Sequence, residues 1–75
     1  MQQPSLGRIV LYTNLGDAAG KYPPEQQPAI ITRVRDAEKG IVCLHIFYPT
    51  GQFDRDDVPF SETFEKGCWS WPPRV

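Results

Sequence analysis

Two apolar segments separated by a short polar connection dominate the pattern of the chain. The segments are residues 29–35 and 41–48, and the connection between them is residues 36–40. Isoleucine and valine recur along both segments, and β-branched side chains favour a pleated, half-buried surface over a helix. The pattern therefore predicts a β-hairpin and, with it, a small all-β domain.

Alternation along the two segments predicts which side chains form the core. In the first segment Arg33 and Arg35 share one face. The opposite face is therefore expected to point inward, and it carries Ile30, Thr32 and Val34. In the second segment one face is uniformly aliphatic and is also expected to point inward. That face consists of Val42, Leu44 and Ile46.

One strand is predicted before the hairpin, at residues 7–13. It is followed by a long connection, residues 14–28, which contains Pro23, Pro24 and Pro28. Proline fixes its own φ and pushes the preceding residue out of the α region, so no helix is expected there. Loops of this length are uncommon in compact domains and tend either to bind something or to be disordered.

Two short strands are predicted after the hairpin. A turn at residues 49–51 leads to an edge strand at residues 57–60, since an edge tolerates the proline it contains. Alternating Trp69 and Trp71 indicate a last strand that closes the sheet. Five short strands with a long first loop are typical of an SH3-like barrel, which we expect residues 1–75 to form as a single domain. An OB-like barrel or an open β-meander is the alternative.

The composition narrows the classes of function. Eight Lys and Arg stand against nine Asp and Glu in 75 residues, which gives a net charge of −1. Non-specific nucleic-acid binding relies on an excess of clustered basic residues, and this chain has none. The chain opens without a basic region and a long apolar stretch, and no apolar run approaches the roughly 18 residues that cross a bilayer. We therefore expect no secretory signal and no membrane association.

Reactive side chains form no strong catalytic or metal-binding motif. Cys43 and His45 share a strand face and Cys68 could join them, but the short-spaced ligand pairs typical of zinc sites are missing from the sequence. A Cys-His pair on one strand lacks the orienting group and oxyanion donors that acyl transfer needs. We expect free thiols, no metal, no cofactor, no catalytic residue and a protein that is not an enzyme.

Three segments resemble a family of small phage and prophage proteins of unassigned role. They are residues 7–12, residues 28–34 and the ending at residues 67–73. The resemblance implies a viral origin, a compact β fold and no catalytic residue at these positions. It also implies a location in the host cytoplasm or in the virion.

Aromatic residues form the pattern that most suggests a function. Two Trp, three Tyr and four Phe occur in a chain whose core already has its aliphatic side chains. Tyr and Trp supply large, rigid contact area and dominate interface hot spots. The aromatic residues expected on a partly exposed surface are Tyr12, Tyr22, Tyr48, Trp69 and Trp71.

These residues predict a non-enzymatic protein-interaction module. The first long loop of an SH3-like barrel lies beside the final strand, so Tyr22 is expected to approach Trp69 or Trp71 and form a groove for an extended peptide. Acidic side chains from a solvated loop would select a basic ligand there. These are Asp54, Asp56 and Asp57. The expected partner is a virion component, a host protein or a second copy of the chain, which would make a homo-oligomer.

The alternative prediction is a protein that binds single-stranded nucleic acid. Bases would stack on the same aromatic rings while Arg33 and Arg35 contact phosphates. The net charge of −1 makes this alternative the less favoured of the two.

Overall fold

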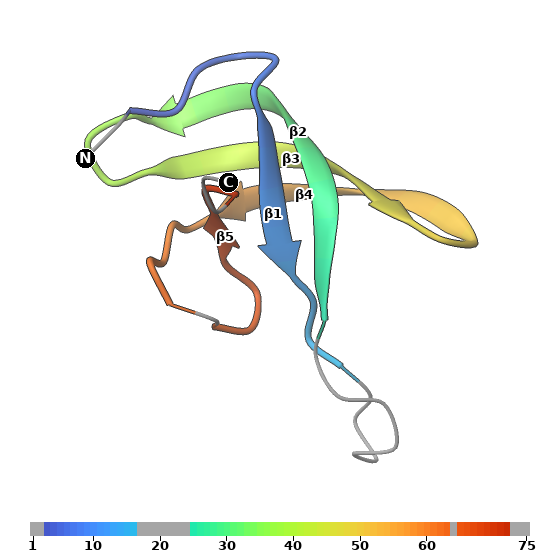
Figure 1. Ribbon diagram of the computed structural model, residues 1–75. Coiled ribbons are helices and arrows are strands. Elements are labelled where there is room, and N and C mark those ends of the chain that lie inside the picture. The colour runs from blue at the N-terminus through green and yellow to red at the C-terminus, as the bar shows by residue number, and fades with distance from the viewer. Residues whose placement is uncertain (1–2, 17–24, 64, 73–75) are drawn as a thin grey trace.

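The computed structural model describes residues 3–16, 25–63 and 65–72, and these form an all-β fold without a helix (Figure 1). The strands are β1 (Ile9–Thr13), β2 (Gln26–Asp36), β3 (Ile41–Tyr48), β4 (Gly51–Val58) and β5 (Trp69–Ser70). Neighbouring strands are antiparallel and lie in the order β4-β3-β2-β1-β5. Five antiparallel strands with the longest connection between β1 and β2 agree with the small SH3-like β fold predicted from the sequence. No helix in the described residues is long and apolar enough to span a membrane.

The two ends of the sheet approach each other because the sheet curls (Figure 1). Just after β4, Phe60 forms a parallel bridge with Trp69 of β5. The backbone N–H of Trp69 donates to the carbonyl of Pro59 at 2.9 Å, and the N–H of Ser61 donates to the carbonyl of Trp69 at 2.9 Å. The last strand therefore closes a small barrel-like fold, as predicted from the alternation of the two tryptophans.

The core fills the inside of this curl. The inward face predicted for β3 is confirmed, since Val42, Leu44 and Ile46 are all buried. The indole N–H of Trp69 donates to the carbonyl of Gly40 at 2.7 Å and so ties β5 to the connection between β2 and β3. The buried core cluster consists of Val10, Tyr12, Ala29, Ile31, Val42, Leu44, Ile46, Val58 and Trp69.

The inward face predicted for β2 is wrong over the first half of the segment. Ala29 and Ile31 are buried, whereas Thr32 is exposed. The cause is a register shift between Ile31 and Arg33, which makes Thr32 an extra residue on β2. One extra residue reverses the alternation of the following side chains, so both Ile31 and Val34 face the core.

Pro28 lies within β2, so this strand begins earlier than the sequence predicted. It stands opposite Leu11 of β1. The pairing of β2 with β3 extends only as far as Ala29, opposite Ile46. A proline has no N–H to donate and is tolerated where a strand has lost one of its neighbours. The long connection predicted at residues 14–28 is shortened accordingly.

The predicted acidic loop is in fact a strand. β4 spans Gly51–Val58, so Asp54, Asp56 and Asp57 lie on it rather than in a solvated loop before a short strand at residues 57–60. Charged residues made this segment look like a loop, because they are rare in central strands. At a sheet edge they are common, since they discourage pairing with other chains.

Candidate functional site

Two of the aromatic residues predicted at the surface lie in the core instead. Tyr12 is 1% exposed and Trp69 is 0% exposed, so the prediction of partial exposure is wrong for both. A chain this small can bury only a limited fraction of its surface. Because aromatic rings bury more area per residue than aliphatic side chains, they are used to fill the interior of the barrel. Trp69 therefore cannot line a peptide groove.

The hydroxyl of Tyr12 is buried without a hydrogen-bond partner among the described residues. Burial raises the pKa of Tyr12, and the positive charge of Arg55 offsets part of that rise. The guanidinium carbon of Arg55 lies 5.9 Å from the centre of the tyrosine ring. Tyr12 is therefore a neutral phenol with a structural role.

Trp71 and Tyr48 are the two predicted aromatic residues that reach the surface in part. Trp71 packs edge-on against Trp69, with ring centroids 5.1 Å apart, and the guanidinium carbon of Arg8 lies 5.1 Å from the Trp71 ring. Tyr48 packs edge-on against Phe53, with ring centroids 5.2 Å apart, and Phe53 is 60% exposed. The remaining predicted ring, Tyr22, lies outside the described residues.

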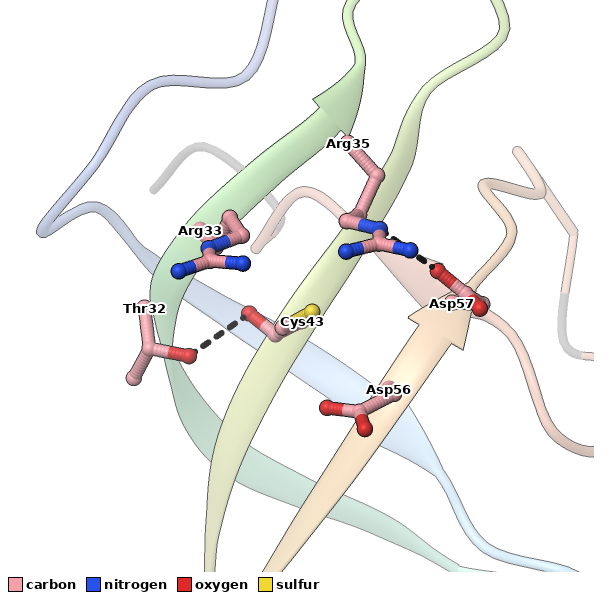
Figure 2. A pocket seen from close by; sticks show the side chains of 6 residues that line it. All are labelled: Thr32, Arg33, Arg35, Cys43, Asp56 and Asp57. Atoms are coloured by element: carbon pink, nitrogen blue, oxygen red, sulfur yellow. Dashed lines mark hydrogen bonds and ion pairs between the residues drawn. The ribbon is translucent and has the colours of Figure 1, made fainter.

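The three acidic residues of β4 lie on the outer face of the sheet, not beside the tryptophans. Asp57 forms an ion pair with Arg35 of β2, with Oδ1 and Nε 3.1 Å apart. Asp56 and Asp57 border an open hollow of about 330 Å³ on this face (Figure 2). Trp69 is inside the barrel, so a basic ligand bound next to it would not meet these carboxylates.

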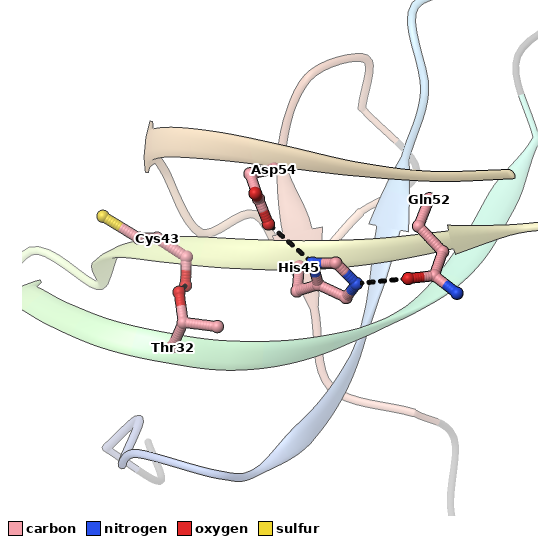
Figure 3. Close-up of polar contacts among 5 residues, drawn as sticks. All are labelled: Thr32, Cys43, His45, Gln52 and Asp54. Atoms are coloured by element: carbon pink, nitrogen blue, oxygen red, sulfur yellow. Dashed lines mark hydrogen bonds and ion pairs between the residues drawn. The ribbon is translucent and has the colours of Figure 1, made fainter.

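His45 lies in the same outer face and has an acceptor on each ring nitrogen (Figure 3). Its Nδ1 is 2.6 Å from Oδ1 of Asp54, and its Nε2 is 2.9 Å from Oε1 of Gln52. Both nitrogens can donate at once only when the imidazole is protonated. The hydrogen bond to Asp54, followed by that to Gln52, raises the pKa of His45 above its ordinary value of 6.5.

Titration of His45 should therefore report this arrangement. By NMR we expect a pKa above 6.5 in the folded chain and a lower value in the Asp54→Asn variant. Because folding raises the pKa, the stability contributed by His45 is complete below pH 6.5 and is lost as the pH rises through the folded-state pKa. The matched control is Asp56→Asn, which removes a carboxylate from the same strand. An equal fall of the pKa in both variants would contradict the assignment to Asp54.

An apolar set that the sequence did not predict lies on the outer face of β1, β2 and β3. Residues opposite each other in a sheet share a face, and Ile30 stands opposite both Ile9 of β1 and His45 of β3. Leu11 and Pro28 form a neighbouring pair on this face. We call this set the apolar face. Phe47 lies two residues after His45 on β3 and therefore shares its face. The members of the apolar face are Ile9, Leu11, Pro28, Ile30 and Phe47.

The apolar face is accessible and lies apart from the core. Ile9 is 62% exposed, Pro28 is exposed, and Leu11, Ile30 and Phe47 are half-buried. Phe47 contacts the ring of His45 edge-on, with centroids 4.9 Å apart. The sequence contains a signal for this face. Successive residues of a strand point to opposite faces, so two adjacent apolar residues, such as those at positions 30 and 31, indicate a strand that is apolar on both faces.

The residues weighed for metal binding do not converge. The side chains of Cys43 and His45 point apart (Figure 3). Within the described residues no three His, Cys, Asp or Glu side chains gather closely enough to hold a metal ion. Both cysteines are free thiols, and burial, followed by the charge of Glu65, raises the pKa of Cys68. A raised pKa keeps this thiol protonated and weakly nucleophilic.

No protein-family model matches the sequence, and comparisons with curated proteins and with solved structures give no match. The resemblance to phage and prophage proteins therefore stays a prediction. The fold and the outer surface of the sheet define the molecule as a small β-barrel-like domain with an apolar face and a charged hollow.

Proposed function

We propose that this chain is a non-enzymatic protein-interaction module that binds its partner through the apolar face. The observation that supports this function is the set of apolar side chains that lies outside the core and extends over three neighbouring strands, with Ile9 62% exposed. Soluble proteins seldom leave a contiguous apolar patch uncovered unless it serves binding.

Charged groups around the apolar face also fit a protein partner. Arg33 and Arg35 lie on β2 beyond Ile30, and Asp54 follows His45 across the sheet on β4. An apolar centre with a polar rim is the usual anatomy of protein interfaces, in which rim charges guide encounter and exclude wrong partners. Phe47 supplies the rigid ring that such interfaces favour as an anchor.

A protein partner is favoured over single-stranded nucleic acid because of what surrounds the two arginines. Arg35 is already paired with Asp57, and Arg33 shares the hollow with Asp56 and Asp57. A phosphate that approached either arginine would meet two carboxylates. If the chain is of phage origin, the partner is a virion component or a host protein; self-association would make the partner a second copy.

The test compares two exposed apolar residues that differ in position. Ile9→Glu changes the apolar face, and Leu6→Glu changes a residue that is 72% exposed and precedes β1. We expect Ile9→Glu to weaken capture of the partner, or self-association measured by sedimentation, at least about tenfold, equivalent to about 1.4 kcal/mol. Leu6→Glu should bind as the unaltered chain does, and both variants should keep their melting temperature.

Two results would contradict the proposal. One is unchanged binding and unchanged self-association in the double variant Ile9→Glu, Phe47→Glu. The other is binding of an oligonucleotide with a steep dependence on salt concentration. If Arg33→Gln abolished this binding and Ile9→Glu left it intact, the nucleic-acid alternative would be favoured.

A further inference from the structure

The hollow on the outer face of the sheet lies beside Cys43 of β3. At this residue the pairing of β3 with β2 and its pairing with β4 both shift register. On one side the shift between Ile31 and Arg33 inserts an extra residue into β2. On the other side the pairs of β3 with β4 shift between Val42 and Leu44. We call this the Cys43 hollow, and its lining residues are Thr32, Arg33, Arg35, Cys43, Asp56 and Asp57.

The two register shifts crowd charged side chains around one central residue. Val42 pairs with Val58 and Leu44 pairs with Arg55, so Asp56 and Asp57 both stand opposite Cys43. Asp57 has a φ of 54°, in the left-handed region that non-glycine residues seldom occupy. Bulges re-aim side chains, and a backbone held in such a conformation is typical of functional sites.

The walls of the Cys43 hollow carry opposite charges, as Figure 2 shows. Arg33 and Arg35 come from β2, and Asp56 and Asp57 come from β4. Arg35 and Asp57 pair with each other at 3.1 Å across one end. The side chains of Arg33 and Asp56 make no ion pair with any described residue, so one guanidinium and one carboxylate are left to receive a ligand.

This charge arrangement selects against simple ions. Two guanidinium groups and two carboxylates sum to no net charge. An isolated anion gains from the arginine wall but is repelled by the aspartate wall, and the reverse holds for an isolated cation. A ligand that carries both charges is attracted by both walls. The hydroxyl of Thr32 donates to the backbone carbonyl of Cys43 at 3.2 Å. This hydrogen bond links β3 to β2 at the residue that precedes Arg33.

We propose that the Cys43 hollow binds a zwitterionic group, with a carboxylate on Arg33 and an ammonium or guanidinium group on Asp56. This chemistry is available from a free amino acid or from neighbouring acidic and basic side chains of a partner protein. The site goes beyond the proposed function, because no residue that lines the hollow is a member of the apolar face, which Arg33 and Arg35 only border, and either site can fail alone.

The experiment follows the backbone amide NMR signals of Thr32 and Cys43 in the full chain. The probes are glycine, β-alanine, 4-aminobutyrate and 6-aminohexanoate, which separate the two charges by increasing lengths. Acetate and methylammonium are the single-charge controls. We expect saturable shifts with at least one zwitterion and at least tenfold weaker binding of both single-charge probes.

Matched variants locate the site. Arg33→Gln and Asp56→Asn each remove one unpaired charge from an exposed position and should weaken zwitterion binding at least tenfold. Glu38→Gln removes an exposed charge from the connection between β2 and β3 and should leave binding unchanged. Ile9→Glu should also leave it unchanged, which keeps this test separate from that of the apolar face.

A second arm separates the two sources of the ligand. It uses an extended peptide with Glu and Lys two positions apart and a control peptide with Gln at both positions. Tighter binding of the charged peptide than of every free zwitterion assigns the hollow to a partner protein, and the reverse order assigns it to a small molecule. The proposal is overturned if no probe saturates, if acetate binds as tightly as the zwitterions, or if Arg33→Gln and Asp56→Asn both bind like the unaltered chain.

Discussion

Replacement of Trp69 by alanine is expected to leave the chain largely unfolded at room temperature. The indole is fully buried, and its N–H donates to the carbonyl of Gly40. The centroid of its ring lies 4.8 Å from that of Phe60 and 5.1 Å from that of Trp71. Truncation of a buried aromatic side chain to alanine costs about 3–5 kcal/mol. A core of this size supplies roughly the same amount of stability in total.

Denaturant unfolding followed by circular dichroism measures this loss. The control is Trp71→Ala, which removes a half-buried indole and should cost at least about 1 kcal/mol less, since less apolar surface is lost from the interior. Trp69→Phe keeps most of the ring and removes the hydrogen bond to Gly40, so it should fall between the two. Equal midpoints for Trp69→Ala and Trp71→Ala would contradict the central position assigned to Trp69.

Gly40→Ala is expected to have the second-largest effect. Gly40 has a φ of 73°, and an added Cβ would lie 2.8 Å from the Cβ of Phe60. A Cβ cannot swing away by side-chain rotation, so the backbone itself has to move. Left-handed backbone costs about 1–2 kcal/mol for alanine, and overpacking of a core adds about 1–3 kcal/mol. We expect a loss of about 2–5 kcal/mol in the free energy of unfolding.

Gly7 provides a matched control for this substitution. Its φ is 85°, and an added Cβ would meet no atom within 4 Å. Gly7→Ala should therefore show the backbone cost alone, about 1–2 kcal/mol. The difference between the two variants measures the contact with Phe60. If chemical denaturation gave the same loss for both, close packing at Gly40 would be refuted.

The elements that sequence reasoning predicted well are those with local signals. The aliphatic alternation at Val42, Leu44 and Ile46 continues without interruption, so the inward face of β3 follows from period two alone. The polar connection at residues 36–40 marks the hairpin between β2 and β3. Five strands with a long first connection then restrict the topology to a few choices.

The elements that sequence reasoning placed wrongly depend on non-local pairing. The bulge at Thr32 leaves no distinctive residue in the chain, yet it decides which side chains of β2 face the core. Nothing local distinguishes an aromatic ring that fills the barrel from one that meets a partner, so the prediction of partial exposure fails for Tyr12 and Trp69. The position of the bulge and the burial of these rings both depend on which strands pair and in which register.

The candidate site shows the same division. The acidic residues Asp54, Asp56 and Asp57 could be singled out by type, and they are exposed. Their meeting with Arg33 and Arg35 could not be predicted, because it requires the register of three strands and the shifts in both ladders. The apolar face was not predicted, because simple alternation places Ile30 in the core and the bulge at Thr32, which reverses that alternation, leaves no local signal.

The contact between Trp69 and Trp71 gives the molecule an internal optical reporter. Two indoles with centroids 5.1 Å apart and planes at 85° form a pair of interacting chromophores, whose excited states mix and add a split band to the circular dichroism spectrum. The band reports whether β5 and the residue that follows it keep their folded conformation. Ligands on the outer face of the sheet should leave the two rings in place, so the band checks the fold while NMR shifts of outer-face residues follow binding.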